Sequence, residues 1–230
     1  MVCPTPAAML NLYIETLDKK RQEVFQDLVK FSGDYTLGGG TALALLLNHR
    51  RSFDFDLFSA GEINPLQLQR LVSFFGKENI EVIVDTADEL SVTLNREIKI
   101  SYIYFPFPPL HPLVETSSVS LFSLDDLASN KAYVLGRRPA YRDYVDLYFL
   151  LKDKMVILED LIQETLKRFG GAFSEKLFLE QLTYQADLKD FAIDFIGPSI
   201  SGESVQKYFD EIVRKYLAKR LPESDKGITR

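Results

Sequence analysis

The sequence GGGTALALLLNHRRSFDFDLF, from Gly38 to Phe58, contains the most informative pattern in the chain. A short apolar run precedes the glycines, and a strongly apolar segment from Ala42 to Asn48 follows them, with Thr41 as the expected N-cap. Apolar and acidic residues then alternate from Phe53 to Phe58. This order predicts a strand, a glycine turn, a helix and a second strand.

The alternation in the second strand places two carboxylates together. Residues two apart on a strand point to the same side, so Asp54 and Asp56 are predicted to project from one face. The intervening Phe53, Phe55 and Leu57 are predicted to face the core. Neighbouring carboxylates repel each other unless a cation lies between them, and oxygen ligands select Mg²⁺ or Mn²⁺. The pattern therefore predicts Asp54 and Asp56 as metal ligands.

The glycine turn complements these carboxylates. Without side chains, Gly39 and Gly40 let backbone N–H groups approach an anion at a helix N-terminus, where the dipole favours phosphate. An ordinary turn and a solvated edge strand would explain each half of the pattern alone. Together, an anion-binding turn and a metal-binding pair are what phosphoryl or nucleotidyl transfer requires.

Two segments here resemble the first motif of the AbiEii/AbiGii toxin family of nucleotidyltransferases, within the DNA polymerase β-like superfamily. They are Gly39-Gly40-Thr41-Ala42-Leu43 and Arg50-x-Ser52-x-Asp54-x-Asp56-x-Phe58. The resemblance implies an α/β (α+β) fold, with a nucleotidyltransferase-type mixed β-sheet flanked by helices and an all-helical C-terminal region. It implies an enzyme that uses Mg²⁺, or Mn²⁺, to move a nucleotide from an NTP to a hydroxyl.

The resemblance also implies roles for individual residues. Asp54 and Asp56 would bind one or two metal ions, and the amides of Gly39 and Gly40, with Thr41, would hold the triphosphate. The next two residues of the motif, Arg50 and Ser52, would contact phosphate or brace the loop. For Arg50, pairing with an acid to brace the loop is nearly as well supported.

Two further segments of the chain resemble later motifs of the same family. They are Ser123-x-x-Asp126-x-x-x-x-Lys131 and Arg142-Asp143-x-x-Asp146-Leu147. By this resemblance, Lys131 would contact the phosphates and neutralise the leaving pyrophosphate, while Asp143 or Asp146 would shape the nucleotide pocket or orient that lysine. Without the resemblance, these residues would be surface charges, with acids favoured near a helix start.

The sequence departs from the family at the third carboxylate. The family pattern resembles a lysine followed closely by an acid on a later strand; here Lys99 fits as a nucleotide-binding residue, but Ser101 stands where the acid is expected. Glu97 is a candidate substitute because it shares the alternation. Since the third carboxylate often accepts a proton from the attacking hydroxyl, catalysis could be weakened while NTP binding survives.

Length, composition and charge limit the class of protein further. The 230 residues, 46% of them hydrophobic, can bury a sizeable core, and the net charge of −6 gives no global sign of nucleic-acid binding. A single cysteine, Cys3, excludes an internal disulfide. No signal peptide and no apolar run of about 18 residues is visible. We expect a cytoplasmic protein without a membrane span, with a core domain at 1–121 and a helical region at 122–230 that completes the site.

Periodicity predicts the other elements. The expected helices are 5–31, broken once near 19–22, then 65–75, 123–135, 142–152, 158–169, 175–184 and 203–220; the expected strands are 80–85, 90–95, 97–105 and 114–121. In the helix expected at 65–75, the residues predicted to be buried are Leu66, Leu68, Leu71, Val72 and Phe75.

The sequence does not identify the molecule that accepts the nucleotide. The family suggests either an RNA end, such as that of tRNA, or a protein hydroxyl. Two basic patches, which solvation alone would also explain, are candidate RNA contacts: Arg137, Arg138 and Arg142, then Lys207, Arg214, Lys215, Lys219 and Arg220. The family also suggests a cognate antitoxin. The alternative is a catalytically silent NTP-binding or interaction protein; a purely helical adaptor would leave the first motif unexplained.

Overall fold

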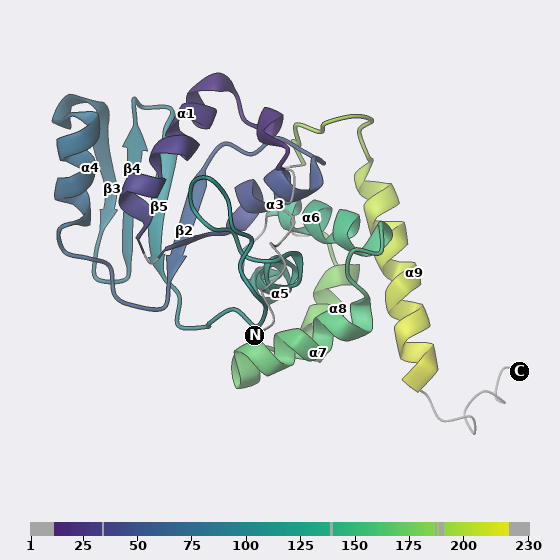
Figure 1. The fold of residues 1–230 in the computed structure, drawn as a ribbon. Coiled ribbons are helices and arrows are strands. Elements are labelled where there is room, and N and C mark those ends of the chain that lie inside the picture. The colour runs from purple at the N-terminus through teal and green to yellow at the C-terminus, as the bar shows by residue number, and fades with distance from the viewer. Residues whose placement is uncertain (1–11, 34, 139, 187, 189–190, 221–230) are drawn as a thin grey trace, which may run out of the picture. The chain divides into compact units, whose positions relative to one another are not determined.

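The computed structural model describes residues 12–33, 35–138, 140–186, 188 and 191–220 (Figure 1). Their contacts divide the chain into two compact units. The first extends to Leu127 and includes Asp194–Ile196, and the second comprises Ala128–Ile193 and the chain from Gly197 onward. This division falls within helix α5 (Leu124–Val134). The domain boundary after residue 121 stays a prediction. Cys3 lies outside the described residues.

The first unit contains a five-stranded mixed sheet in the order β1-β2-β5-β4-β3, which Figure 1 shows with α4 beside β3. Only β2 and β5 pair in parallel; the other neighbours are antiparallel. The strands are β1 (Thr36–Leu37), β2 (Phe55–Ser59), β3 (Ile80–Asp85), β4 (Glu89–Leu94) and β5 (Ile98–Tyr104). This is the mixed sheet that the sequence predicts.

The two faces of the sheet differ in polarity. Register places Asp56 of β2 opposite Ser101 of β5, and Ser101 opposite Ser91 of β4, so these polar side chains share one face. The alternate residues of the same strands, such as Phe55 and Ile100, are fully buried on the other face. The strands therefore bring a polar row together against an apolar core.

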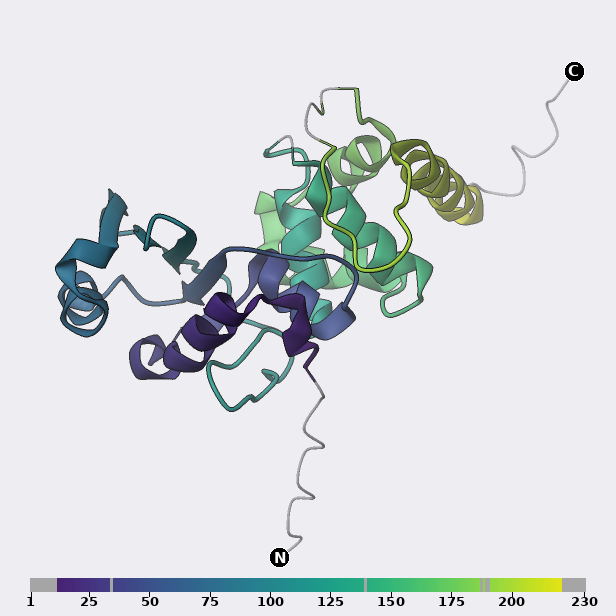
Figure 2. The same ribbon diagram turned by 90° about the horizontal axis from the view of Figure 1, so that it is seen from above.

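Short helices complete the first unit, and Figure 2 shows them from above. They are the 3-10 helices Ile14–Thr16 and Lys77–Asn79 and the α-helices α1 (Lys19–Asp27), α2 (Val29–Ser32), α3 (Gly39–Leu47) and α4 (Gln67–Phe75). Helix α1 packs on the apolar face, since the Phe25 and Phe55 rings stack with centroids 6.4 Å apart. Helix α4 contributes the buried Leu71 and Gln67, whose amide donates to the Phe31 carbonyl at 3.1 Å.

Two predictions around the glycines are wrong in detail. Helix α3 begins at Gly39 with Gly38 as its N-cap, so Thr41 lies inside the first turn. Its hydroxyl bonds the Asp54 carbonyl, which removes it from capping. Strand β2 begins at Phe55, and Phe53 is 46% exposed beneath the Arg21 guanidinium, 5.1 Å from the ring centroid, instead of facing the core.

Other boundaries also differ. The described part of the N-terminal helix is interrupted before Lys19, because Asp18 caps α1 by accepting from the Arg21 N–H at 3.0 Å; residues 5–11 lie outside the described ranges. The strand predicted at 114–121 is reduced to isolated bridges of Leu121 with Val114 and Leu37. Leu66 is 59% exposed because α4 begins one residue after it.

The second unit is helical, as predicted. Besides the end of α5, it contains α6 (Tyr141–Lys152), α7 (Leu158–Phe169), the 3-10 helix Gly170–Ala172, α8 (Glu175–Thr183) and α9 (Gly202–Arg220). Helix α9 contacts α6, α7 and α8. It does so through an apolar stripe at helical spacing, formed by Val205, Phe209, Val213 and Tyr216. None of the helices in the described ranges is long and apolar enough to cross a membrane.

Candidate functional site

The glycine turn and the Asp-x-Asp strand meet closely. Gly39, the first residue of α3, has φ of +65°, a backbone conformation that favours glycine. A Cβ at this position would lie 2.5 Å from Asp56 Oδ2. The Asp56 carboxylate therefore lies directly against the N-terminal backbone of α3, where the helix dipole favours negative charge.

Asp54 differs from Asp56 in its surroundings. It lies one residue before β2, and its backbone carbonyl is tied to the Thr41 hydroxyl. Within the described ranges, its carboxylate has no hydrogen-bond or ion-pair partner. This carboxylate is therefore available to a ligand.

A small polar network braces the connection between α3 and β2. The hydroxyls of Thr41 and Ser52 are 2.9 Å apart, and Arg50 Nη1 donates to the Arg51 carbonyl at 3.0 Å. A Cβ on Gly40 would meet Arg50 Nη2 at 2.5 Å and Ser52 Oγ at 3.1 Å. Arg50 is only 4% exposed. These contacts tie Arg50 to a backbone carbonyl of the loop; its pairing with an acid and its contact with phosphate both stay predictions.

Residues from late in the sequence hold the same loop. The Arg51 N–H donates to the Asp194 carbonyl at 2.8 Å, and the Ile196 N–H donates to the His49 carbonyl at 3.1 Å. Arg50 and Phe195 form an isolated antiparallel bridge between these two bonds. Sequence reasoning missed this segment, because three residues in a connecting loop carry no periodic or compositional signal.

Ser101 occupies the position on β5 where the family pattern has the third carboxylate. Ser101 stands opposite Asp56, is 1% exposed, and has its hydroxyl 2.9 Å from that of Ser91. Lys99 lies on the same face, and its ammonium has no partner in the described part of the chain. Glu97, the proposed substitute acid, precedes β5 and pairs with Lys20 Nζ at 2.5 Å.

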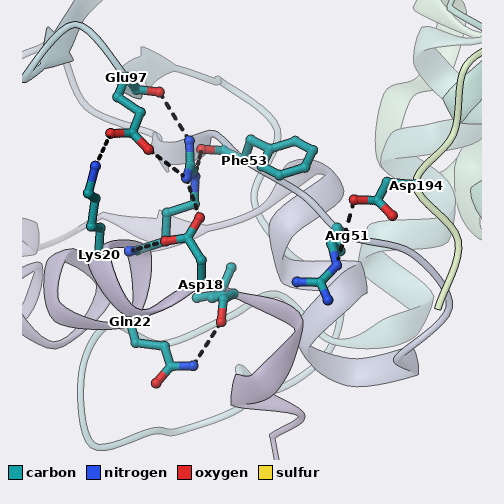
Figure 3. Close-up of polar contacts among 9 residues, drawn as sticks. Asp18, Lys20, Gln22, Arg51, Phe53, Glu97 and Asp194 are labelled. Atoms are coloured by element: carbon teal, nitrogen blue, oxygen red, sulfur yellow. Dashed lines mark hydrogen bonds and ion pairs between the residues drawn. The ribbon is translucent and has the colours of Figure 1, made fainter.

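Arg21 anchors both strands of the site, and sequence reasoning missed it; Figure 3 labels its partners Asp18, Phe53 and Glu97. Its Nε donates to the Phe53 carbonyl at 2.9 Å and its Nη2 to the Glu97 carbonyl at 3.1 Å. These carbonyls immediately precede Asp54 and the start of β5. Arg21 Nη1 also bonds Asp18, so the side chain, 6% exposed as a residue, ties α1 to the two strands. An arginine within an amphipathic helix gives no sequence signal for this role.

We expect Arg21→Met to lower the free energy of unfolding by about 1–3 kcal/mol, because the change keeps the alkyl stem but leaves two carbonyls without donors. Urea denaturation measures the effect. The matched control is Lys20→Met, which removes an exposed partner of Glu97 from the same helix and should leave the unfolding midpoint unchanged. Equal midpoints for the two variants would show that Arg21 does not anchor the strands.

The second unit holds a buried charge cluster. Lys131 Nζ of α5 lies 2.7 Å from Asp143 Oδ1 and 2.6 Å from Asp146 Oδ2, one turn apart on α6. The three residues are 4%, 1% and 0% exposed. Two of the three ammonium N–H donors are thereby used, and the third has no partner among the described residues. The structure therefore places the three predicted residues in one cluster.

Asp143 is the most strongly held member of this cluster. Arg138 binds it through two hydrogen bonds, Nε to Oδ2 at 2.8 Å and Nη2 to Oδ1 at 3.0 Å. Burial alone would raise the pKa of the Asp143 carboxyl, but the charges of Lys131 and Arg138 and their hydrogen bonds together lower that pKa below its ordinary value. Asp143 therefore stays ionised in the folded unit.

Asp126, the acid of the earlier motif, has a structural role in the first unit. Its amide N–H donates to Ser123 Oγ at 3.0 Å, a capping interaction at the start of α5. Its carboxylate accepts the backbone N–H groups of Leu110 and His111 at 2.8 and 3.1 Å. Asp126 thus positions the proline-rich loop before α5.

The two basic patches are largely engaged by protein groups. Arg138 binds Asp143, and Arg137 donates to the carbonyls of Tyr133 and Ala172, whereas Arg142 is exposed. On α9, three of the five basic residues pair with acids: Lys215 with Glu211, Lys219 with Glu159, and Arg220 with Glu175. Salt bridges thus account for much of the second patch.

The fit of a metal ion can be judged from the donor set. The described residues contain no group of three or more His, Cys, Asp or Glu side chains that could hold a metal. The first unit offers the pair Asp54 and Asp56. Mg²⁺ commonly binds one or two carboxylates and completes its shell with substrate phosphates and water, so the pair fits an ion that arrives with a nucleotide.

Solved structures identify the class of fold. A candidate nucleotidyltransferase from H. pylori aligns with 18% identity and a TM-score of 0.53, covering 90% of this chain and 96% of that one. JHP933 from Helicobacter pylori aligns with 18% identity and a TM-score of 0.52, covering 90% and 94%. The chain therefore has a nucleotidyltransferase-like fold, with a mixed sheet and a helical C-terminal region.

Sequence comparisons identify the family. The family described as nucleotidyl transferase AbiEii toxin, type IV toxin–antitoxin system, matches residues 24–215, so the chain belongs to this family. An uncharacterised protein of Aquifex aeolicus (strain VF5) is 26% identical over 207 residues, 87% of this chain and 98% of that protein. The resemblance seen in the sequence motifs is thus confirmed. Family and fold support a transferase, and the family suggests a nucleotide substrate and a cognate antitoxin.

Proposed function

We propose that this protein is a Mg²⁺-dependent nucleotidyltransferase and the toxin of a toxin–antitoxin pair. It moves a nucleotide from an NTP to a hydroxyl of RNA, with tRNA as one candidate, or of a protein. The observation that carries the proposal is the Asp56 carboxylate against the backbone of Gly39, with Asp54 two residues earlier. This contact joins the acidic pair to a helix N-terminus suited to phosphate.

The residues near the glycine turn receive distinct roles in this proposal. Asp54 and Asp56 hold Mg²⁺ or Mn²⁺, which supplies positive charge to the phosphates when bound. The amides of Gly39 and Gly40 bind phosphate oxygens, and Lys99 contributes a cation from the polar face of the sheet. Its lack of a partner within the described ranges supports this role, because a partly buried ammonium favours an anionic partner.

The lysine cluster of the second unit is proposed to bind phosphate as well. Lys131 has one unused N–H donor in the described part of the chain, and the carboxylates of Asp143 and Asp146 hold its ammonium in one orientation. A cation held in this way can neutralise charge that develops on leaving pyrophosphate.

Label transfer tests the function. Purified protein is incubated with Mg²⁺ or Mn²⁺, each α-labelled NTP in turn, total RNA and a protein extract. We expect label on RNA or protein with the wild type. Asp54→Asn together with Asp56→Asn should reduce transfer about 100-fold or more, because the metal contributes several kcal/mol of charge stabilisation. Chelation of the metal should have the same effect.

The matched control is Asp85→Asn, an exposed carboxylate on β3 that has no partner among the described residues. This variant should transfer label at the wild-type rate. Transfer by the Asp54 and Asp56 double variant at that rate would contradict the proposal.

A second candidate function is NTP binding without transfer, and Ser101 favours it. Ser101 stands opposite Asp56, where the family pattern expects an acid, and a serine hydroxyl is a poor proton acceptor. Wild-type protein that binds an NTP with Mg²⁺ but transfers no label, while the double variant does not bind, would support this candidate.

A further inference from the structure

The polar face of the sheet contains a chain of hydrogen-bonding groups that starts beside Asp56. Ser101 is the direct neighbour of Asp56 on β5, and its hydroxyl lies 2.9 Å from Ser91 Oγ on β4. Ser91 Oγ in turn lies 2.5 Å from Glu89 Oε1. Both serines are buried, at 0% and 1% exposed, whereas Glu89 is partly exposed at the beginning of β4.

The number of protons gives this chain a direction. Each hydroxyl carries one hydrogen, and an ionised carboxylate carries none. Ser91 Oγ is placed to donate to both Glu89 Oε1 and Ser101 Oγ, but it has only one hydrogen. When that hydrogen lies in the shorter contact to Glu89, Ser101 supplies the hydrogen between the two serines, and the donors point from Ser101 to Ser91 to Glu89. Ser101 Oγ is left with a lone pair, in the position next to Asp56 where the family pattern has a carboxylate.

We propose that Glu89 is the proton acceptor of the transfer reaction and acts through Ser91 and Ser101. The proposal rests on the transferase activity proposed above. The acceptor hydroxyl oxygen forms a bond to the α-phosphorus of the NTP, and the bond from this phosphorus to the bridging oxygen breaks, which releases pyrophosphate. The hydroxyl proton passes to Ser101 Oγ as Ser101 passes its proton to Ser91. Ser91 passes its own proton to Glu89, which becomes a neutral carboxylic acid.

This arrangement accounts for the serine at position 101. The acid is moved from β5 to β4, and two hydroxyls span the distance. Because Glu89 is partly exposed, it can return the proton to solvent after each turnover. Glu89 is thus a positioning residue that acts through Ser101, and Glu97, engaged by Lys20, is not required for this step.

The test compares transfer rates and NTP binding in three variants. Glu89→Gln keeps the size of the side chain but removes its basicity, and Ser91→Ala cuts the chain while Glu89 remains. Each should slow transfer about 100-fold to 10,000-fold at unchanged NTP affinity, the usual contribution of a general base. The variant with both changes should be no slower than either single variant, because both interrupt one path.

Rescue provides a second readout that a structural role would not produce. Ser101→Asp in the Glu89→Gln background places a carboxylate beside Asp56 and should restore transfer at least about 10-fold. Glu81→Gln is the matched control. It removes an exposed carboxylate on β3, opposite Thr93 of β4, and should leave the transfer rate unchanged.

The possible outcomes separate the two proposals. If the wild type transfers label and Glu89→Gln transfers it at the same rate, the proton path is wrong and the transferase stands. If the fold-reduction in the combined variant equals the product of the fold-reductions for Glu89→Gln and Ser91→Ala, the two residues act independently. The proton path is then also wrong. If the wild type itself transfers no label, the proposed function fails, and the proton path fails with it.

Discussion

Replacing Lys131 by methionine is expected to lower the free energy of unfolding by about 3–5 kcal/mol, because two buried carboxylates lose their shared ammonium. Lys131 Nζ lies 2.7 Å from Asp143 and 2.6 Å from Asp146, and all three side chains are almost inaccessible. Methionine retains the apolar stem, so the change tests the charge more than the packing. Urea denaturation followed by circular dichroism measures the loss.

Two controls separate the buried charge from general effects of the substitution. Lys167→Met removes an exposed lysine of α7 and should change the free energy by no more than about 0.5 kcal/mol. Adding Asp146→Asn to Lys131→Met should recover part of the loss, because one uncompensated charge disappears. A loss for Lys131→Met no larger than that for Lys167→Met would show that the cluster does not stabilise the second unit.

Acid pH gives an independent check on the same cluster. Since folding lowers the pKa of Asp143, its ionised form stabilises the wild type above its unfolded pKa, and this stability is lost as the pH falls through the folded pKa. The Lys131→Met variant lacks the part of this stabilisation that Lys131 supplies, while Arg138 still binds Asp143. We therefore expect the difference in unfolding free energy between variant and wild type to shrink as the pH is lowered.

Replacing Gly39 by alanine is expected to lower the free energy of unfolding by about 2–5 kcal/mol, the sum of a left-handed backbone cost and a steric collision. The new methyl group would lie 2.5 Å from Asp56 Oδ2. The carboxylate must move away from the N-terminus of α3, so label transfer should also fall, by about 10-fold or more for a displacement near 1 Å. Urea denaturation and the label-transfer assay measure the two effects.

Gly33 offers a matched control for the free-energy cost of placing alanine at a positive φ. It also has a positive φ, +46°, but a Cβ there would meet nothing within 4 Å. Gly33→Ala should therefore show only the backbone cost, about 1–3 kcal/mol, and retain wild-type transfer. If Gly39→Ala and Gly33→Ala behave alike in both assays, the contact between Gly39 and the Asp56 carboxylate has no functional role.

The sequence predicted the elements whose signals are local. The alternation around Asp54 and Asp56 predicted β2, and apolar periodicity predicted helices α6 to α9, because a strand or helix must present one apolar face whatever packs against it. The motif around Gly39 was also sufficient for the family, which the match over residues 24–215 confirms.

Predictions failed where a side chain had a choice of partners. Thr41 is a good capping residue, yet its hydroxyl bonds the Asp54 carbonyl, so the cap falls to Gly38. Phe53 fits the apolar alternation, but it precedes the strand and is exposed beneath Arg21. In both cases a tertiary contact outweighs a local preference worth about 1 kcal/mol.

The sequence by itself therefore determined the family, the mixed sheet and the helical second half. Only the tertiary structure decided that Arg21 anchors the two strands of the site, that Asp194–Ile196 hold the loop after α3, and that Ser101 connects to Glu89 through Ser91. The physical reason is that periodicity reports which way a side chain faces, whereas hydrogen bonds depend on strand register and on loops that no periodic pattern encodes.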